Sequence, residues 1–204
     1  MPKYFIPLFF FASILSGQIN HQEKLVIKRK LGQSTVTFDF DIRTNETGFF
    51  HKHLDVGFHY PIKPTWKVGL KYRAQYRFND GEWDLEKRPQ AELIKSIERP
   101  NAKWQLRTRM DYRIRNEKND EMRSRSRIQW KLPKSFTRFK ITPFFNNEFL
   151  FAVETWKYNQ NRFSIGFDLP KSKIGKPTIF YKNFQTLKDG EWVSSYILVI
   201  KMAI

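Results

Sequence analysis

From about Ser34 onward, apolar and polar residues alternate along the chain with a period of two. The clearest stretch runs from Trp66 to Phe78, where apolar residues, most of them large, are separated by Lys, Arg, Gly and Gln. Successive side chains of a β-strand point to opposite faces, so this pattern predicts a strand with one apolar face and one strongly basic face. Helical spacing fits almost nowhere in the chain.

Ten segments with period-two alternation or short apolar runs predict ten strands, of which the segment 91–97 has the weakest pattern. Their ranges are 36–42, 54–60, 66–78, 91–97, 104–114, 122–132, 139–151, 163–169, 178–184 and 196–204. Turn-forming residues separate the segments and fall into two sets that alternate along the chain. Such alternation is expected when an even number of antiparallel strands places its turns at the two ends of a barrel.

The direction of the apolar face decides between a membrane protein and a soluble one. Ten strands with five or six large apolar residues each would supply roughly fifty bulky side chains, more than the interior of a small barrel can hold. Facing lipid, they need no shared core. The sequence therefore predicts an all-β protein, a closed up-and-down antiparallel transmembrane β-barrel of about ten strands (range 8–12) with a polar, Arg-rich interior. A soluble exported β-barrel is the alternative.

The N-terminus has the pattern of a secretory signal. A short positive start at Lys3 is followed by an uncharged apolar run from Tyr4 to Leu15, and Ser16-Gly17 supplies small residues for cleavage. We therefore expect a signal peptide at 1–17, an N-terminal periplasmic segment at 18–33, and the barrel domain at 34–204. Residues 24–30 could form a further strand, but an eleventh would break the even number expected for a bacterial barrel.

The charge is strongly basic, with 37 Lys and Arg against 20 Asp and Glu and a formal net charge of +17. Nucleic acid is the obvious partner for such a charge, and the 34 aromatic residues could serve as stacking platforms. The aromatic and basic residues lie on opposite strand faces, however, and could not contact one nucleic-acid strand together. We therefore expect no nucleic-acid partner. The chain has no Cys, which excludes disulfides and thiolate chemistry.

The basic strand faces predict a wall of Lys and Arg side chains inside the barrel, paired with carboxylates on the same interior face. The predicted wall residues are Lys71, Arg73, Arg77, Arg107, Arg109, Arg113, Arg123, Arg125 and Arg127. The predicted carboxylate partners are Asp39, Asp41, Asp55, Glu92, Glu148 and Asp168. Two interpretations stay open: a salt-bridged, closed lumen with a structural role, or a narrow pore or pocket that prefers anions.

No catalytic constellation is evident, and no cofactor is expected. Ser194 and Ser195 lie near a turn without the signature of a nucleophile elbow, and no Gly-rich phosphate loop is present. His51 and His53 share one strand face and are the only weak candidates for metal ligands, because a third ligand would have to come from another strand. No metal site is therefore assigned, and hydrogen bonding in the lumen is the expected role of these histidines.

Short motifs spread over most of the chain are shared with one bacterial family. They are Val68-Gly69-Leu70-Lys71-Tyr72-Arg73, Trp83 with Arg88-Pro89, the series Arg107, Arg109, Tyr112 and Arg113, the series Arg123, Arg125 and Arg127, Pro143 with Asn147-Glu148-Phe149, and Asn161-Arg162 with Gly166. In these motifs the chain resembles an uncharacterised (domain of unknown function) family of bacterial outer-membrane-β-barrel-like proteins. The resemblance implies a barrel and supplies no catalytic residues.

Taken together, the pattern predicts an outer-membrane β-barrel protein of a Gram-negative bacterium, with a structural role or a narrow anion-preferring pore. The expected partners are outer-membrane lipid and lipopolysaccharide, with small anionic solutes as candidates for passage. The alternative is a soluble exported β-barrel that binds an anionic or lipidic ligand. A barrel enzyme that acts on lipid or surface polysaccharide is a third and weaker hypothesis.

Overall fold

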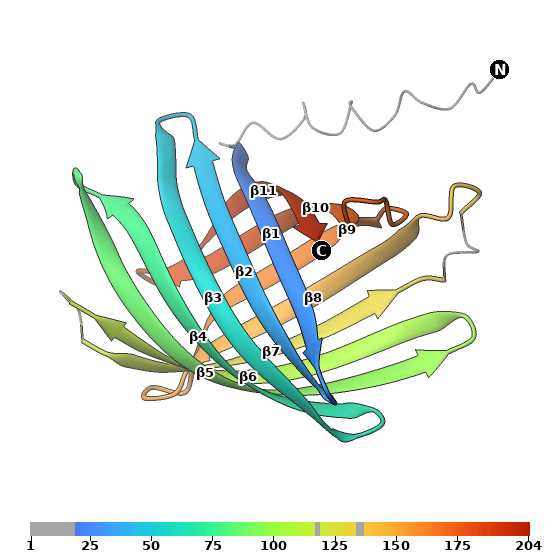
Figure 1. The fold of residues 1–204 in the computed structure, drawn as a ribbon. Helices are drawn as coiled ribbons and strands as arrows, with labels where there is room; N and C mark the ends of the chain where they lie inside the picture. The colour runs from blue at the N-terminus through green and yellow to red at the C-terminus, as the bar shows by residue number, and fades with distance from the viewer. Residues whose placement is uncertain (1–18, 117–118, 134–136) are drawn as a thin grey trace.

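The computed structural model describes residues 19–204 except 117–118 and 134–136, and shows a barrel of β-strands (Figure 1). The expected signal peptide, 1–17, lies outside the described residues. The strands are β1 (Ile19–Leu31), β2 (Ser34–Asn45), β3 (Gly48–Lys63), β4 (Trp66–Asn79), β5 (Glu82–Arg99), β6 (Ala102–Arg115), β7 (Glu121–Lys131), β8 (Thr142–Ala152), β9 (Lys157–Asp168), β10 (Lys176–Lys188) and β11 (Glu191–Ala203). Within the described residues, no helix is long and apolar enough to cross a membrane.

Each strand pairs with its neighbours in sequence, and β1 pairs with β11 to close the barrel. All ten predicted strands are present as β2 to β11, so the predicted all-β barrel of about ten strands is confirmed. All sequential pairs are antiparallel, whereas β1 and β11 are parallel, with Ile19 opposite Tyr196 and Val26 opposite Ala203. The barrel is therefore a mixed one of eleven strands.

The expectation that residues 18–33 lie outside the barrel is wrong, because Ile19–Leu31 forms the closing strand. An even number of strands would have required β11 to pair directly with β2, with the start of β2 and the end of β11 at the same rim. An eleventh strand instead closes with a parallel pair, a solution for which a mitochondrial membrane barrel with an odd number of strands is a precedent. Its weak alternation, with Glu23 and Arg29 on the outer face, hid β1 in the sequence.

The two ends of the barrel can be named by its strands. At the N-terminal end, where β1 begins, lie the turns 46–47, 80–81, 153–156 and 189–190, and the chain passes from β6 to β7 there. At the C-terminal end, where β11 ends, lie the turns 32–33, 64–65, 100–101 and 169–175, and the chain passes from β7 to β8 there. Asp80 and Asp189 have positive φ, and each is followed by a glycine that also has positive φ. These Asp-Gly pairs are typical of two-residue hairpin turns.

The distribution of side chains is inverted relative to a soluble globular protein. Among the described residues, 34 large hydrophobic side chains are exposed, whereas only six apolar side chains are buried. In contrast, 22 polar or charged side chains are buried, and they line the inside of the barrel. On β3, for example, His51, His53 and Asp55 are buried and alternate with the exposed Leu54 and Val56.

Aromatic side chains cluster near both ends of the barrel. At the C-terminal end, the rings of Trp104 and Trp130 stack with their centroids 5.7 Å apart. At the N-terminal end, Trp83 lies between Phe49 and Phe78, at 5.1 and 5.3 Å. Two separated aromatic bands on an otherwise apolar outer surface are typical of the interfacial girdles of membrane barrels.

One side of the lumen departs from the charged pattern. Phe184, Ile197 and Val199 are buried together on β10 and β11, with Phe180 packed against them. The ring of Phe184 has the cations of Arg162 and Lys182 at 4.8 and 5.2 Å from its centroid. This apolar strip gives the neighbouring luminal cations an aromatic surface in addition to their polar partners.

Gly69 provides space inside the barrel for the contact between β3 and β5. A Cβ atom added at Gly69 would lie 2.6 Å from Cδ2 of His59, whose Nε2 is 2.6 Å from Oε1 of Glu92. We expect Gly69→Ala to lower the free energy of unfolding by about 1–3 kcal/mol, because the buried pair must shift. Urea unfolding of the refolded protein measures this change in the free energy of unfolding. Ala91→Val, on the exposed outer face of β5, is the control and should leave stability within about 0.5 kcal/mol.

Candidate functional site: the basic lumen

The interior face of β4, β6 and β7 carries the predicted basic wall. Arg109, Arg123 and Arg125 are buried, whereas Arg77 lies at the more exposed N-terminal end. Arg107 is opposite Arg127 and Arg109 is opposite Arg125, so guanidinium groups of β6 and β7 face the lumen side by side. The structure therefore brings the wall residues together on one continuous inner surface. They are Lys71, Arg73, Arg77, Arg107, Arg109, Arg113, Arg123, Arg125 and Arg127.

Glu148 on β8 binds three arginines of this surface. Its Oε1 accepts a hydrogen bond from Nη2 of Arg107 at 2.7 Å, and its Oε2 accepts one from Nη2 of Arg125 at 2.6 Å. Arg162 on β9 reaches Oε2 at 3.4 Å. Glu148 is 5% exposed, so one buried carboxylate links the positive charges of three strands.

Asp55 on β3 and Glu92 on β5 form ion pairs with other residues of the basic wall. Arg73 donates two hydrogen bonds to the Asp55 carboxylate, from Nε at 2.5 Å and from Nη2 at 2.7 Å, and Lys71 adds a third at 3.2 Å. Nη2 of Arg109 lies 2.8 Å from Oε2 of Glu92. These fork-shaped contacts fix the guanidinium planes as well as neutralising charge.

The other three predicted carboxylates are also in ion pairs. Asp39 lies 2.6 Å from Nζ of Lys24, and Asp41 lies 3.2 Å from Nε of Arg43. Asp168 binds two lysines near the C-terminal end, at 2.6 and 2.7 Å. All six carboxylates singled out from the sequence therefore lie among luminal cations.

Several luminal residues were missed by the sequence reasoning. Glu86 and Arg88 are buried on β5, where Glu86 binds both Arg88 and Arg113. Their strand was predicted only from residue 91, because Lys87 and Pro89 interrupt its outward apolar face. Arg43 follows the polar face of the segment 36–42 but was not counted in the basic wall. Arg162 lies one position before the predicted start of β9, so extending the alternation by one residue would have placed it inside.

Three cavities follow one another along the lumen. A central cavity of about 210 Å³ shares Arg43, Arg73 and Arg162 with a cavity of about 230 Å³ that reaches Asn159 and Leu187 near the N-terminal end. On its other side, the central cavity shares four lining residues with a cavity of about 600 Å³ that reaches the turns of the C-terminal end. These four are Arg127, Asn146, Phe180 and Lys201. The three cavities are therefore adjacent along the interior, with basic side chains at both junctions.

The three cavities carry a large excess of positive charge. The central cavity is lined by eleven Lys or Arg residues and four Asp or Glu residues, a formal excess of +7. The cavity at the N-terminal end has seven against one, and the cavity at the C-terminal end has seven against two. Ion pairing within the lumen therefore leaves a positive interior, which favours anions over cations.

Several donors on this surface have no hydrogen-bond partner within the described part of the chain. They include the Nε atoms of Arg107, Arg125, Arg127 and Arg162, all of which are buried and line the central cavity. Arg127 also has no carboxylate partner in this part of the structure, and its Nη2 donates to Oε1 of Gln105 at 2.8 Å. Buried N–H groups without a partner keep their partial positive charge beside the cavity, which adds to its preference for anions.

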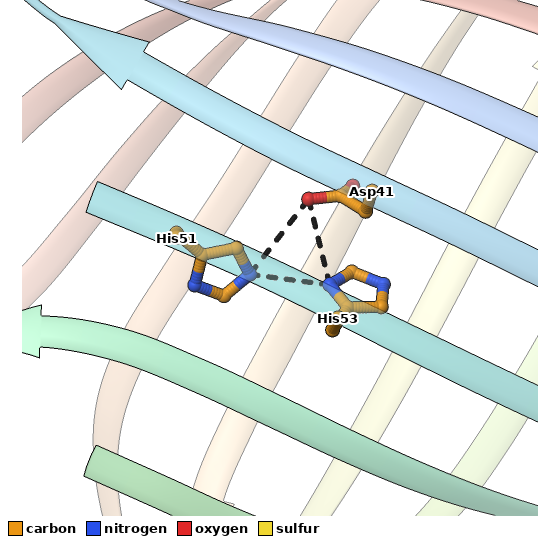
Figure 2. Close-up of side chains that lie close together, drawn as sticks. All are labelled: Asp41, His51 and His53. Atoms are coloured by element: carbon orange, nitrogen blue, oxygen red, sulfur yellow. Dashed lines mark hydrogen bonds and ion pairs between the residues drawn. The ribbon is translucent and has the colours of Figure 1, made fainter. Parts of the chain in front are cut away.

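The two candidate histidines lie on the lumen face of β3, and the structure places Asp41 of β2 beside them (Figure 2). Nε2 of His51 and Nδ1 of His53 are 3.1 Å apart, which is a hydrogen-bond distance. Oδ1 of Asp41 lies 3.7 Å from the first nitrogen and 3.4 Å from the second. All three residues are buried. The third polar group that the sequence could not identify therefore comes from the neighbouring strand.

Comparison with known proteins identifies one family. A family model described as protein of unknown function (DUF2490) matches residues 21–193. The chain belongs to the DUF2490 family. The DUF2490 match begins in β1 and includes every residue of the basic wall, its carboxylate partners and the Asp41 cluster. No curated protein and no solved structure matches the chain.

Proposed function

We propose that this protein is an outer-membrane β-barrel of a Gram-negative bacterium whose narrow, basic lumen admits small anions. The observation that carries the membrane assignment is the inverted distribution of side chains: in the described part of the chain, 34 large hydrophobic residues are exposed, most of them on outward strand faces, and the interior is charged. A soluble protein rarely exposes an apolar surface of this extent. In a bilayer, the same surface contacts acyl chains, and a closed barrel satisfies its backbone hydrogen bonds internally.

Two further features support the membrane assignment. The strands of the barrel have 11–18 residues, enough for tilted strands to cross a bilayer. Aromatic clusters lie near both ends, where the interfaces with lipid headgroups and lipopolysaccharide would be. The secretory pattern of residues 1–17 supports export. A soluble exported barrel would leave the apolar outer surface without a partner.

The preference for anions rests on the lumen. Its three cavities are adjacent and share lining residues, and each has more Lys and Arg than Asp and Glu. The basic residues at the junctions, Arg43, Arg73 and Arg162 on one side and Arg127 and Lys201 on the other, would meet any solute on the path. Rings of Arg and Lys favour anions in narrow pores. The volumes suit small anionic solutes.

Planar-bilayer recording of the refolded protein tests this function. In a salt gradient, we expect small conductance steps with a reversal potential of the sign for anion selectivity. Arg127→Gln combined with Lys182→Gln should move the reversal potential toward zero, because both cations line the central cavity and have no carboxylate partner within the described residues. Lys171→Gln, in an exposed turn, is the matched control and should leave it unchanged.

Two results would contradict the proposal. A correctly folded barrel that conducts no current in the bilayer would indicate the closed, salt-bridged lumen with a structural role. Cation selectivity would contradict the charge argument directly. The membrane assignment is checked separately by fractionation, in which we expect the protein with the outer membrane and a heat-modifiable migration on gels. Recovery as a soluble periplasmic protein without detergent would exclude it.

A further inference from the structure

We propose that Asp41, His51 and His53 form a binding site for a divalent transition-metal ion, with zinc as the ion that best suits two imidazoles and one carboxylate. Figure 2 shows the two rings on β3 and the carboxylate on β2 turned toward one another. Imidazole and carboxylate are common zinc ligands, and three protein ligands with an open fourth position are the arrangement of reactive zinc sites. Zinc binding here does not depend on the proposed passage of anions and can be tested independently of it.

The spacing of the three ligand atoms fits tetrahedral coordination. Metal–ligand bonds of about 2.0–2.1 Å at tetrahedral angles place neighbouring ligand atoms roughly 3.3–3.4 Å apart. The observed separations are 3.1 Å between Nε2 of His51 and Nδ1 of His53, 3.4 Å from His53 to Oδ1 of Asp41, and 3.7 Å from His51 to the same oxygen. An ion could therefore bind with shifts of a few tenths of an ångström.

Neighbouring polar residues are placed to orient the ligands by hydrogen bonds, as they do in metal sites. Nε2 of His53, the nitrogen turned away from the other two ligands, is buried without a hydrogen-bond partner in the described structure and lies 3.9 Å from Oδ1 of Asp55. A ligand histidine commonly donates its second N–H to a carboxylate, which fixes the tautomer. Gln22 donates to Oδ2 of Asp41, so that carboxylate is oriented with Oδ1 toward the histidines.

The charged residue next to the site and the cavities beside it determine how an ion would bind and which ligand it could take up. Arg43 shares Oδ1 of Asp41 at 3.2 Å, and it competes with a cation for this oxygen. His51 lines the cavity toward the N-terminal end, and Asp41 and His53 line the central cavity, so an open coordination position would face the lumen. Water or an oxyanion could fill that position. A bound ion would thus add a fixed positive centre to an already basic surface.

Zinc titration of the full-length mature chain, refolded in detergent without a histidine tag, tests the site. The chain has four histidines, so each can be examined separately. We expect one Zn²⁺ per chain by calorimetry, with affinity reduced at least about tenfold in His53→Asn and in Asp41→Asn. Co²⁺ should give a visible absorption band that is lost in the same variants. Arg43→Gln should bind Zn²⁺ more tightly, because it removes the competitor for Asp41.

The remaining histidines provide matched controls. His59→Asn and His21→Asn should bind Zn²⁺ like the unmodified chain, since His59 is paired with Glu92 and His21 lies on the exposed face of β1. Circular dichroism and heat-modifiable migration verify that each variant is folded. The absence of stoichiometric Zn²⁺ binding to the unmodified chain would overturn the proposal, as would binding that survives in folded His53→Asn or disappears in His59→Asn.

Discussion

Replacing Leu70 by Arg is expected to lower the stability of the barrel in a bilayer by about 2–4 kcal/mol. Leu70 lies on the outer face of β4, away from the strand ends, and is 67% exposed. At such an exposed position in a soluble protein, the same substitution would change stability by no more than about 0.5 kcal/mol. The loss in lipid arises because a guanidinium must enter hydrocarbon or deform the bilayer around it.

Reversible denaturant unfolding in phospholipid vesicles, followed by tryptophan fluorescence, measures this difference. Ile62→Arg is the matched control, because Ile62 is also an exposed apolar residue, 50% exposed, but lies one position from the end of β3. Near the end of a strand, where the bilayer interface would lie, we expect Ile62→Arg to lower the free energy of unfolding by only about 0–1 kcal/mol. Equal, small effects at both positions would argue against a lipid-facing surface and in favour of a soluble barrel.

Removing the carboxylate of Glu148 is expected to destabilise the barrel by about 3–5 kcal/mol, the cost typical of breaking a buried ion pair. In Glu148→Gln, the side chain keeps its size, but Arg107, Arg125 and Arg162 lose their shared negative charge. Three cations on neighbouring strands then lie close together without a shared counter-charge. The effect should be smaller at high salt if ions enter the lumen and screen this repulsion.

The exposed pair of Glu98 and Lys103 is the control for this substitution. Its side chains are 69% and 54% exposed, and it lies at the turn between β5 and β6. Surface ion pairs contribute roughly 0–1 kcal/mol, so Glu98→Gln should leave the unfolding midpoint almost unchanged. A Glu148→Gln variant as stable as the unmodified protein would show that the luminal network is already neutralised by water and ions.

The strands β2 to β11 could be predicted because outward-facing and lumen-facing residues alternate in segments such as Trp66 to Phe78. The same alternation located the carboxylates, since Asp55 and Glu148 fall on the lumen-facing positions of their strands. The alternation of positions along each strand therefore predicts most of the residues that line this lumen.

Closure of the barrel could not be predicted in the same way. β1 has charged residues on both faces, so the alternation that marks the other strands is weak in it. Its pairing with β11 depends on backbone hydrogen bonds between segments about 180 residues apart, and such bonds do not show in the local sequence pattern. The Asp41 cluster was hidden for a related reason. Its third member is on another strand, and only the register that places Asp41 opposite His53 brings them together.

The parallel pairing of the first and last strands has a consequence for how the chain could be rearranged. In most barrels the two chain ends meet at one rim and can be joined by a short linker to make a circular permutant. Here Ile19 and Ala203 are offset by seven residues along the β1–β11 seam, or roughly 23 Å at 3.3 Å per residue. A linker between the two ends would have to run along the wall of the barrel. In the proposed membrane topology, tags fused to the two ends should be accessible from opposite sides of the membrane.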